Sequence, residues 1–230
     1  MKIMVLFAVL TLGVTIVKAD DKPSLAQARK QFDAADKVLN TAYKGTCAEL
    51  DKVKIGELRQ KQRDWLEYRD FMAEAFPQFN GVQTDTPKQT PDYWQMMTDL
   101  SKERTEFLHA YSGENVPSGI SGEYSDSHQG DLELEETKAG IVLSLFVVRG
   151  AHAHTGDVSG NAHLKGDQAF FKDHPDPVEN RVPCELTFTF IDGHIVKIEG
   201  KNTDYYHGMG VSFDGMYYKT GKLKKSIKLE

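Results

Sequence analysis

The sequence predicts an α+β fold in which a helical domain precedes an antiparallel β-domain. In the first half of the chain, apolar residues recur at steps of three and four, which is the period of an amphipathic helix. After Ser112-Gly113 the period changes to two, which is typical of half-buried strands. Pro117, Gly119 and Gly122 follow this change and indicate a linker. The predicted domains are therefore residues 20–112 and residues 113–230.

The first domain is predicted to be a helical hairpin or three-helix unit. Residues 24–75 are predicted to be helical with a break near 52–56, and the second helix is expected to end before Pro77. A polar loop over 78–90 should precede a third helix over 91–111. The apolar stripes of the first two helices are read most simply as core faces. They comprise Phe32, Ala35, Leu39, Ala42, Tyr43 and Leu50, and then Leu58, Gln62, Trp65, Leu66, Arg69 and Met72.

The second domain is predicted to hold seven or eight short antiparallel strands. Leu132 and Leu134 alternate with acidic residues, and residues 141–148 form a continuous apolar and β-branched run. A further alternating strand is followed by an Asp192-Gly193 turn. Short strands separated by such turns are typical of a β-barrel or a β-sandwich, and both architectures remain open at this point.

The first nineteen residues have the layout of a secretory signal peptide. Lys2 gives a positive start, residues 3–17 are almost continuously apolar, and Val17-Lys18-Ala19 is a small-residue cleavage site. The apolar run is short for a membrane span, so we expect cleavage, secretion and no stable span afterwards. An uncleaved N-terminal anchor is the alternative.

The charge of the chain is acidic. Its net charge is −6, and removal of residues 1–19 takes away two lysines and brings it to −8. An acidic surface argues against nucleic acid and anionic membranes as partners and is compatible with a cationic protein partner.

Two cysteines, Cys47 and Cys184, stand one in each half of the chain. In an oxidising compartment they could pair and link the two domains, and two free thiols are the alternative.

Signatures of catalysis are missing from the sequence. It contains no Gly-x-Ser-x-Gly elbow and no phosphate-binding glycine loop before a helix, so we expect no enzyme and no cofactor. His152 and His154 would share one face of a strand, but neither a cysteine pair nor a Glu-rich helix accompanies them. We therefore predict no metal site.

A two-helix motif identifies a family resemblance. The first helix carries Asp36-x-x-Leu39-Asn40-x-x-Tyr43, and the second carries Leu58-x-x-x-Gln62-x-x-Trp65-x-x-Tyr68-Arg69-Asp70. This pattern, over about residues 25–75, resembles the N-terminal domain of LprI-type lysozyme inhibitors. The resemblance implies a small secreted helical domain and, as partner, a lysozyme-type muramidase. It also implies a bacterial periplasmic location.

The chain departs from the family pattern at its cysteines. Family members often carry a cysteine shortly after Tyr-Arg-Asp, paired with one early in the first helix, and here Ala73 stands at the downstream place. The β-half resembles a domain that follows this helical unit in some bacterial periplasmic proteins. The similar segments are Gly122-Glu123-Tyr124, Cys184-x-Leu186-x-Phe188 and Gly208-x-Gly210-Val211-x-Phe213-Asp214-Gly215-x-Tyr217.

Helical spacing predicts a scaffold role for the motif. Gln62, Trp65 and Arg69 share one face of the second helix, and Asn40 and Tyr43 share one face of the first. We expect Trp65 to be buried and Arg69 to bond to a backbone carbonyl or to the Asp36 carboxylate. This interpretation assigns no partner-binding residues.

Two functions are consistent with the sequence. The first is a secreted, non-catalytic binding protein that occludes a muramidase in the manner of a lysozyme inhibitor. The alternative is a β-barrel that binds a small molecule or a cell-wall fragment, with the helices as an interaction module.

Overall fold

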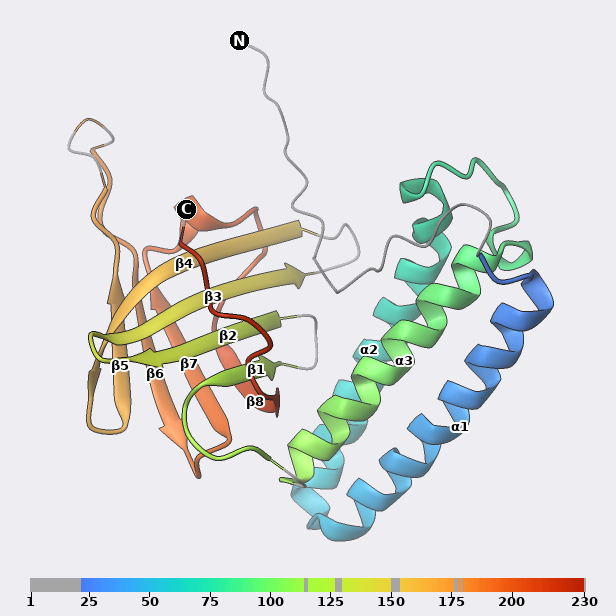
Figure 1. Ribbon diagram of the computed structural model, residues 1–230, viewed down its shortest axis with the longest axis horizontal. Helices are drawn as coiled ribbons and strands as arrows, with labels where there is room; N and C mark the ends of the chain where they lie inside the picture. Colours follow the sequence, from blue (N-terminus) through green and yellow to red (C-terminus); the bar gives the residue numbers. More distant parts are fainter. Residues whose placement is uncertain are drawn as a thin grey trace.

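The computed structural model describes residues 22–113, 116–126, 130–149, 154–175, 178 and 180–229. The predicted signal peptide and His152 lie outside these residues. Three N-terminal helices are followed by eight antiparallel strands that close into a barrel (Figure 1). The predicted α+β class is confirmed, and of the two β-architectures the barrel is the one formed.

The three long helices are α1 (Leu25–Glu49), α2 (Lys52–Phe79) and α3 (Pro91–Ser112). Ser24 forms a capping box with Gln27 at the start of α1. Thr90 caps α3, in which Pro91 takes the first helical position, and Gly113 ends it in the left-handed conformation. A short 3-10 helix, η2 (Pro87–Gln89), lies in the predicted loop before α3.

Two predicted helix boundaries were wrong. The break between α1 and α2 lies at Leu50 and Asp51 instead of 52–56, because the Asp51 carboxylate accepts the backbone N–H groups of Val53 and Lys54 and starts α2 there. The second helix does not end before Pro77 but continues to Phe79. Proline there falls in the last turn, so the helix continues only two residues beyond it.

The helix α3 lies between α1 and α2 (Figure 1) and packs against both, whereas α1 and α2 make few direct contacts. The main helical core brings together one or two apolar residues from each helix: Leu39, Leu58, Trp65, Leu100 and Leu108. The two outer helices are thus held apart by the central one.

The barrel runs in simple meander order. Its strands are β1 (Gly122–Ser125), β2 (Gly130–Thr137), β3 (Gly140–Arg149), β4 (His154–Lys165), β5 (Gln168–Lys172), β6 (Glu185–Ile191), β7 (Ile195–Lys201) and β8 (Gly215–Gly221). Each strand pairs with the next, and β1 pairs with β8 to close the sheet. Closure leaves no unpaired edge on the sheet. The predicted Asp192-Gly193 turn joins β6 to β7, and both residues have positive φ angles, 49° and 73°.

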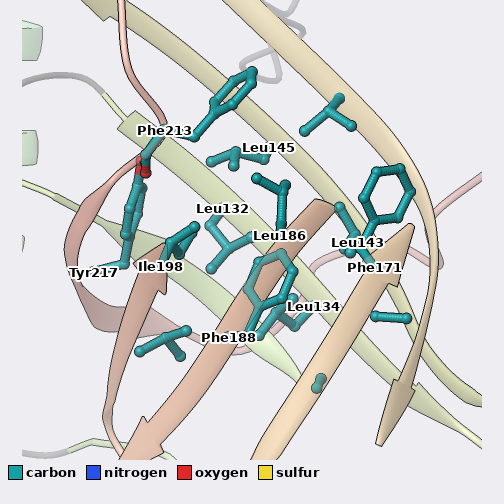
Figure 2. Packing of buried hydrophobic residues seen from close by; sticks show 14 of the residues in the cluster. Leu132, Leu134, Leu143, Leu145, Phe171, Leu186, Phe188, Ile198, Phe213 and Tyr217 are labelled. Atoms are coloured by element: carbon teal, nitrogen blue, oxygen red, sulfur yellow. The ribbon is translucent and has the colours of Figure 1, made fainter. Parts of the chain in front are cut away.

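The barrel interior is filled by side chains (Figure 2). Alternate residues of the strands and of the segment before β8 point inward, and none of those labelled in the figure is more than 6% exposed. They are Leu132, Leu134, Leu143, Leu145, Phe171, Leu186, Phe188, Ile198, Phe213 and Tyr217. This interior is a packed hydrophobic core.

Both cysteines are free thiols in the structure. Cys47 packs against the helical core, and Cys184 is fully buried in the barrel core. The Cys47–Cys184 disulfide that was one alternative is not formed, because each thiol belongs to the core of a different domain.

Aromatic residues join the two domains. Phe107 on α3 meets Tyr218 on β8 edge-to-face at a centroid distance of 5.4 Å, and Tyr111 lies 4.9 Å from the same ring. The buried Lys219 ammonium donates to the carbonyl of Gly119 at 2.6 Å and thereby ties the interdomain linker to β8. The helical domain therefore packs on the barrel through α3.

Acidic groups face each other beside this junction. The side chains of Glu103 on α3 and Asp131 on β2 are exposed, and neighbouring protein atoms displace part of the water around their carboxylates. Desolvation and then the Asp131 charge raise the pKa of Glu103 to about 8. Desolvation and then Asp126 raise the pKa of Asp131 to about 6.

These raised pKa values predict a pH dependence of stability. The ordinary pKa values are 4.5 for Glu103 and 3.8 for Asp131. At pH values between these and the raised pKa values, the folded state binds more protons than the unfolded state. The free energy of unfolding should therefore fall as the pH rises from about 5 to 8. Urea unfolding at both pH values should show a smaller fall for Glu103→Gln than for wild type. Glu49→Gln, at the end of α1, should keep the wild-type fall, and an equal fall in all three proteins would contradict the assignment.

Candidate binding groove in the helical domain

A solvent-open groove of about 420 Å³ lies between α1 and α2. It forms because both helices pack on α3 instead of on each other. Its walls are Asp36, Leu39, Asn40 and Tyr43 from α1, and Arg59, Gln62, Arg63, Leu66 and Arg69 from α2.

Six of the ten motif residues line this groove: Asp36, Leu39, Asn40, Tyr43, Gln62 and Arg69. Of the other four, Leu58 and Trp65 are buried in the core beneath it, Tyr68 is half-buried, and Asp70 is exposed. The motif thus supplies both the groove walls and part of the core that supports them.

The predicted contact between Arg69 and Asp36 crosses the groove as an ion pair of 4.0 Å, which is longer than a hydrogen bond. The hydrogen bonds of Arg69 go instead to Asp70, from Nε at 3.0 Å and from Nη2 at 2.8 Å. Asn40 donates to the Asp36 carboxylate at 2.8 Å and holds it on the α1 wall. The polar end of the groove is therefore fixed in place.

A buried arginine lies beneath the groove. Arg104 on α3 is 2% exposed, and its guanidinium carbon lies 4.6 Å from the Phe107 ring centroid and 5.5 Å from that of Trp65. Its Nε donates to Gln62 Oε1 at 3.0 Å. Burial lowers the pKa of Arg104 to about 9, and the group stays cationic at neutral pH.

The groove is cationic, although the protein as a whole is acidic. Three arginines, Arg59, Arg63 and Arg69, face a single lining carboxylate, that of Asp36. Arg59 also reaches toward Tyr43 across the groove. The pKa of Tyr43 is raised by burial and by the Cys47 thiol, and the Arg59 guanidinium opposes that rise.

Sequence reasoning missed Arg59, Arg63 and Arg104, and it read Leu66 as part of a core face although Leu66 lines the groove. Arg59, Arg63 and Leu66 lie on the same face of α2 as Gln62 and Arg69. This shared face follows from their spacing in the sequence. Arg104 occupies an apolar stripe position, four residues after Leu100 and four before Leu108. A charged residue at such a position is the signal that could have found it.

The described residues can also be searched for a metal-binding cluster and for a membrane-spanning helix. Within the described ranges, no three or more His, Cys, Asp or Glu side chains gather closely enough to hold a metal ion. His154 is exposed at the start of β4. None of the described helices combines the length and the apolar character needed to cross a bilayer.

Trp65 is 4% exposed and lies in the helical core. Trp65→Ala should lower the free energy of unfolding by about 3–5 kcal/mol, because it leaves a large cavity. Thermal or urea unfolding measures this loss. Phe79→Ala, on an exposed ring of the same helix, is the control and should change little. An unchanged melting temperature for Trp65→Ala would contradict the core assignment.

Gln62→Leu tests the support of Arg104. The change removes the acceptor from a buried guanidinium Nε, so we expect a loss of about 1–3 kcal/mol in urea unfolding. Gln78→Leu, an exposed position near the end of the same helix, should stay within about 0.5 kcal/mol of wild type. Equal stability of the two variants would show that Arg104 does not depend on this bond.

Residues 18–108 match the family model described as Lysozyme inhibitor LprI. No curated protein and no solved structure matches the chain. The family match covers less than half of the chain, contains all of α1 and α2, and leaves the barrel outside. The helical domain is therefore similar to the LprI lysozyme inhibitors, as its two-helix motif predicts.

Proposed function

We propose that the protein is a secreted, periplasmic and non-catalytic binding protein that inhibits a lysozyme-type muramidase. The observation that carries this proposal is the coincidence of the family match with the groove. The matched residues include both groove walls, and six motif positions line it. The helical domain is then the binding module.

Occlusion is the physical basis of the proposed inhibition. Lysozyme cleaves its substrate with two carboxyl groups that flank the glycosidic bond. A protein seated over that site would exclude the polysaccharide. A stable interface buries about 800 Å² on each partner, so the groove would form only the centre of the contact. The neighbouring surfaces of α1 and α2 would supply the remainder.

The packed barrel favours the helices as the binding module. Large apolar side chains occupy the barrel interior, where the alternative function would require space for a ligand. The Phe107–Tyr218 contact gives the barrel a different role, as the support on which α3 rests. We therefore pursue the inhibitor function.

The test is residual muramidase activity on cell-wall substrate as the purified two-domain protein is titrated in at near-physiological salt. Stoichiometric loss of activity is expected. Asn40→Trp would fill the groove without changing charge and should weaken inhibition by about tenfold or more. Thr41→Trp, the next exposed residue of α1 and not part of the groove lining, is the matched control.

The possible results distinguish whether the protein inhibits a muramidase from whether the groove is the inhibitory surface. No inhibition of chicken-type, goose-type or invertebrate-type lysozymes by the wild-type protein would refute the proposed function. Inhibition that Asn40→Trp and Thr41→Trp weaken equally would retain the function but would remove the groove from the interface.

A further inference from the structure

We propose that the groove between α1 and α2 is a carboxylate-binding site that accepts acidic side chains of a short peptide segment. The inference rests on the proposed function only in taking this groove as a binding surface. It adds the chemistry of the occupant, and it can stand or fall independently of muramidase inhibition.

The first argument is the charge of the groove walls. Arg59 and Arg63 lie about one turn apart on α2, and Arg69 follows on the same wall. Guanidinium groups present donors in a planar fork that matches a carboxylate. Among the described residues, Arg59 and Arg63 form no ion pair with a carboxylate of the chain, so their charges are available to a ligand. Arg63 is hydrogen-bonded to the neutral side chain of Gln60.

The second argument is that the site is already organised. Arg69 is held by Asp70 and stacks 5.3 Å from the Trp65 ring centroid, with its side chain only 12% exposed. Beneath the same wall, the buried Arg104 bonds to Gln62 and adds a second fixed positive charge. Because these charges are already fixed, ligand binding would lose little conformational entropy in aligning them.

The third argument is the shape and floor of the groove. Leu39, Tyr43 and Leu66 give it apolar surface between the charged positions. A volume of about 420 Å³ accommodates a few side chains and not a folded module. A glutamate fits both features, because its methylene groups can lie on the apolar floor while its carboxylate reaches an arginine.

The fourth argument excludes long polyanions. The net charge of −6 repels nucleic acid at long range, and the three lining arginines cover only a short stretch of α2. A short acidic segment can reach the groove without lying across the acidic remainder of the surface. Its source is either a loop of the partner protein or a free peptide, and both share the same carboxylate chemistry.

The binding test is isothermal titration of the full two-domain protein at low salt with three probes. These are a hexapeptide rich in glutamate, its glutamine counterpart, and inorganic phosphate. We expect the glutamate peptide to bind, its affinity to fall with added salt, and the glutamine peptide to give no heat. No heat from the glutamate peptide, or equally tight binding of phosphate, would overturn the carboxylate site.

Matched variants locate the site. Arg59→Gln/Arg63→Gln should weaken peptide binding by about tenfold or more, since it removes two charge-assisted contacts. Lys138→Gln/Lys165→Gln removes the same charge from exposed barrel positions and should stay within about twofold of wild type. All four positions are exposed, and thermal unfolding checks that both variants remain folded. Equal weakening by both pairs would overturn the assignment to the groove.

A competition arm identifies the source of the carboxylate. If saturating glutamate peptide relieves muramidase inhibition, the partner's own acidic side chains occupy the groove. If the peptide binds and inhibition is unchanged, the groove takes a free acidic peptide beside a separate inhibitory surface. Peptide binding by a protein that inhibits no muramidase would refute the proposed function and leave the site intact.

Discussion

The burial of Arg104 is the constraint on which the helical domain depends. Removing a charge from water is costly, and the cost is limited only when the surrounding groups are placed to interact with it. Here Phe107 and Trp65 lie over the guanidinium, and Gln62 accepts from its Nε. These contacts fix α2 on α3, because a shift of either helix would separate the charge from its aromatic faces and its acceptor.

The same contacts connect the groove to the barrel. Phe107 contacts both Arg104 and Tyr218, so α3 joins the buried arginine beneath the groove to β8. Because α3 lies between α1 and α2, its position also sets the separation of the two groove walls. The barrel, closed on itself and packed with apolar side chains, gives α3 a rigid support. The proposed binding surface on the outer helices is then held by the cores of both domains.

Much of the fold could be predicted from local sequence signals. The caps at Ser24 and Thr90, the glycine at 113 and the change of period all act within a few residues. Barrel closure could not be predicted, because it depends on β1 meeting β8 almost a hundred residues later. The groove was missed for a related reason. Residues of a helix stripe face either the core or a groove wall, and only the position of α3 decides which. Arg104 stood in an apolar stripe, but its stacking partner Trp65 comes from another helix.

In this acidic protein with a cationic groove, the net charge acts on a partner at long range and the groove arginines act at short range. At physiological ionic strength the Debye length is about 8 Å, so the net charge of −6 acts mainly on the approach of a partner. Such a charge favours encounter with a cationic protein and sets the association rate more than the affinity. Inside the contact, desolvation strengthens the interaction between a guanidinium and a carboxylate. A cationic protein whose recognised surface carries acidic side chains satisfies both requirements. A muramidase of net positive charge with carboxyl groups in its cleft has that combination, which is why the two proposals support each other without depending on the same measurement.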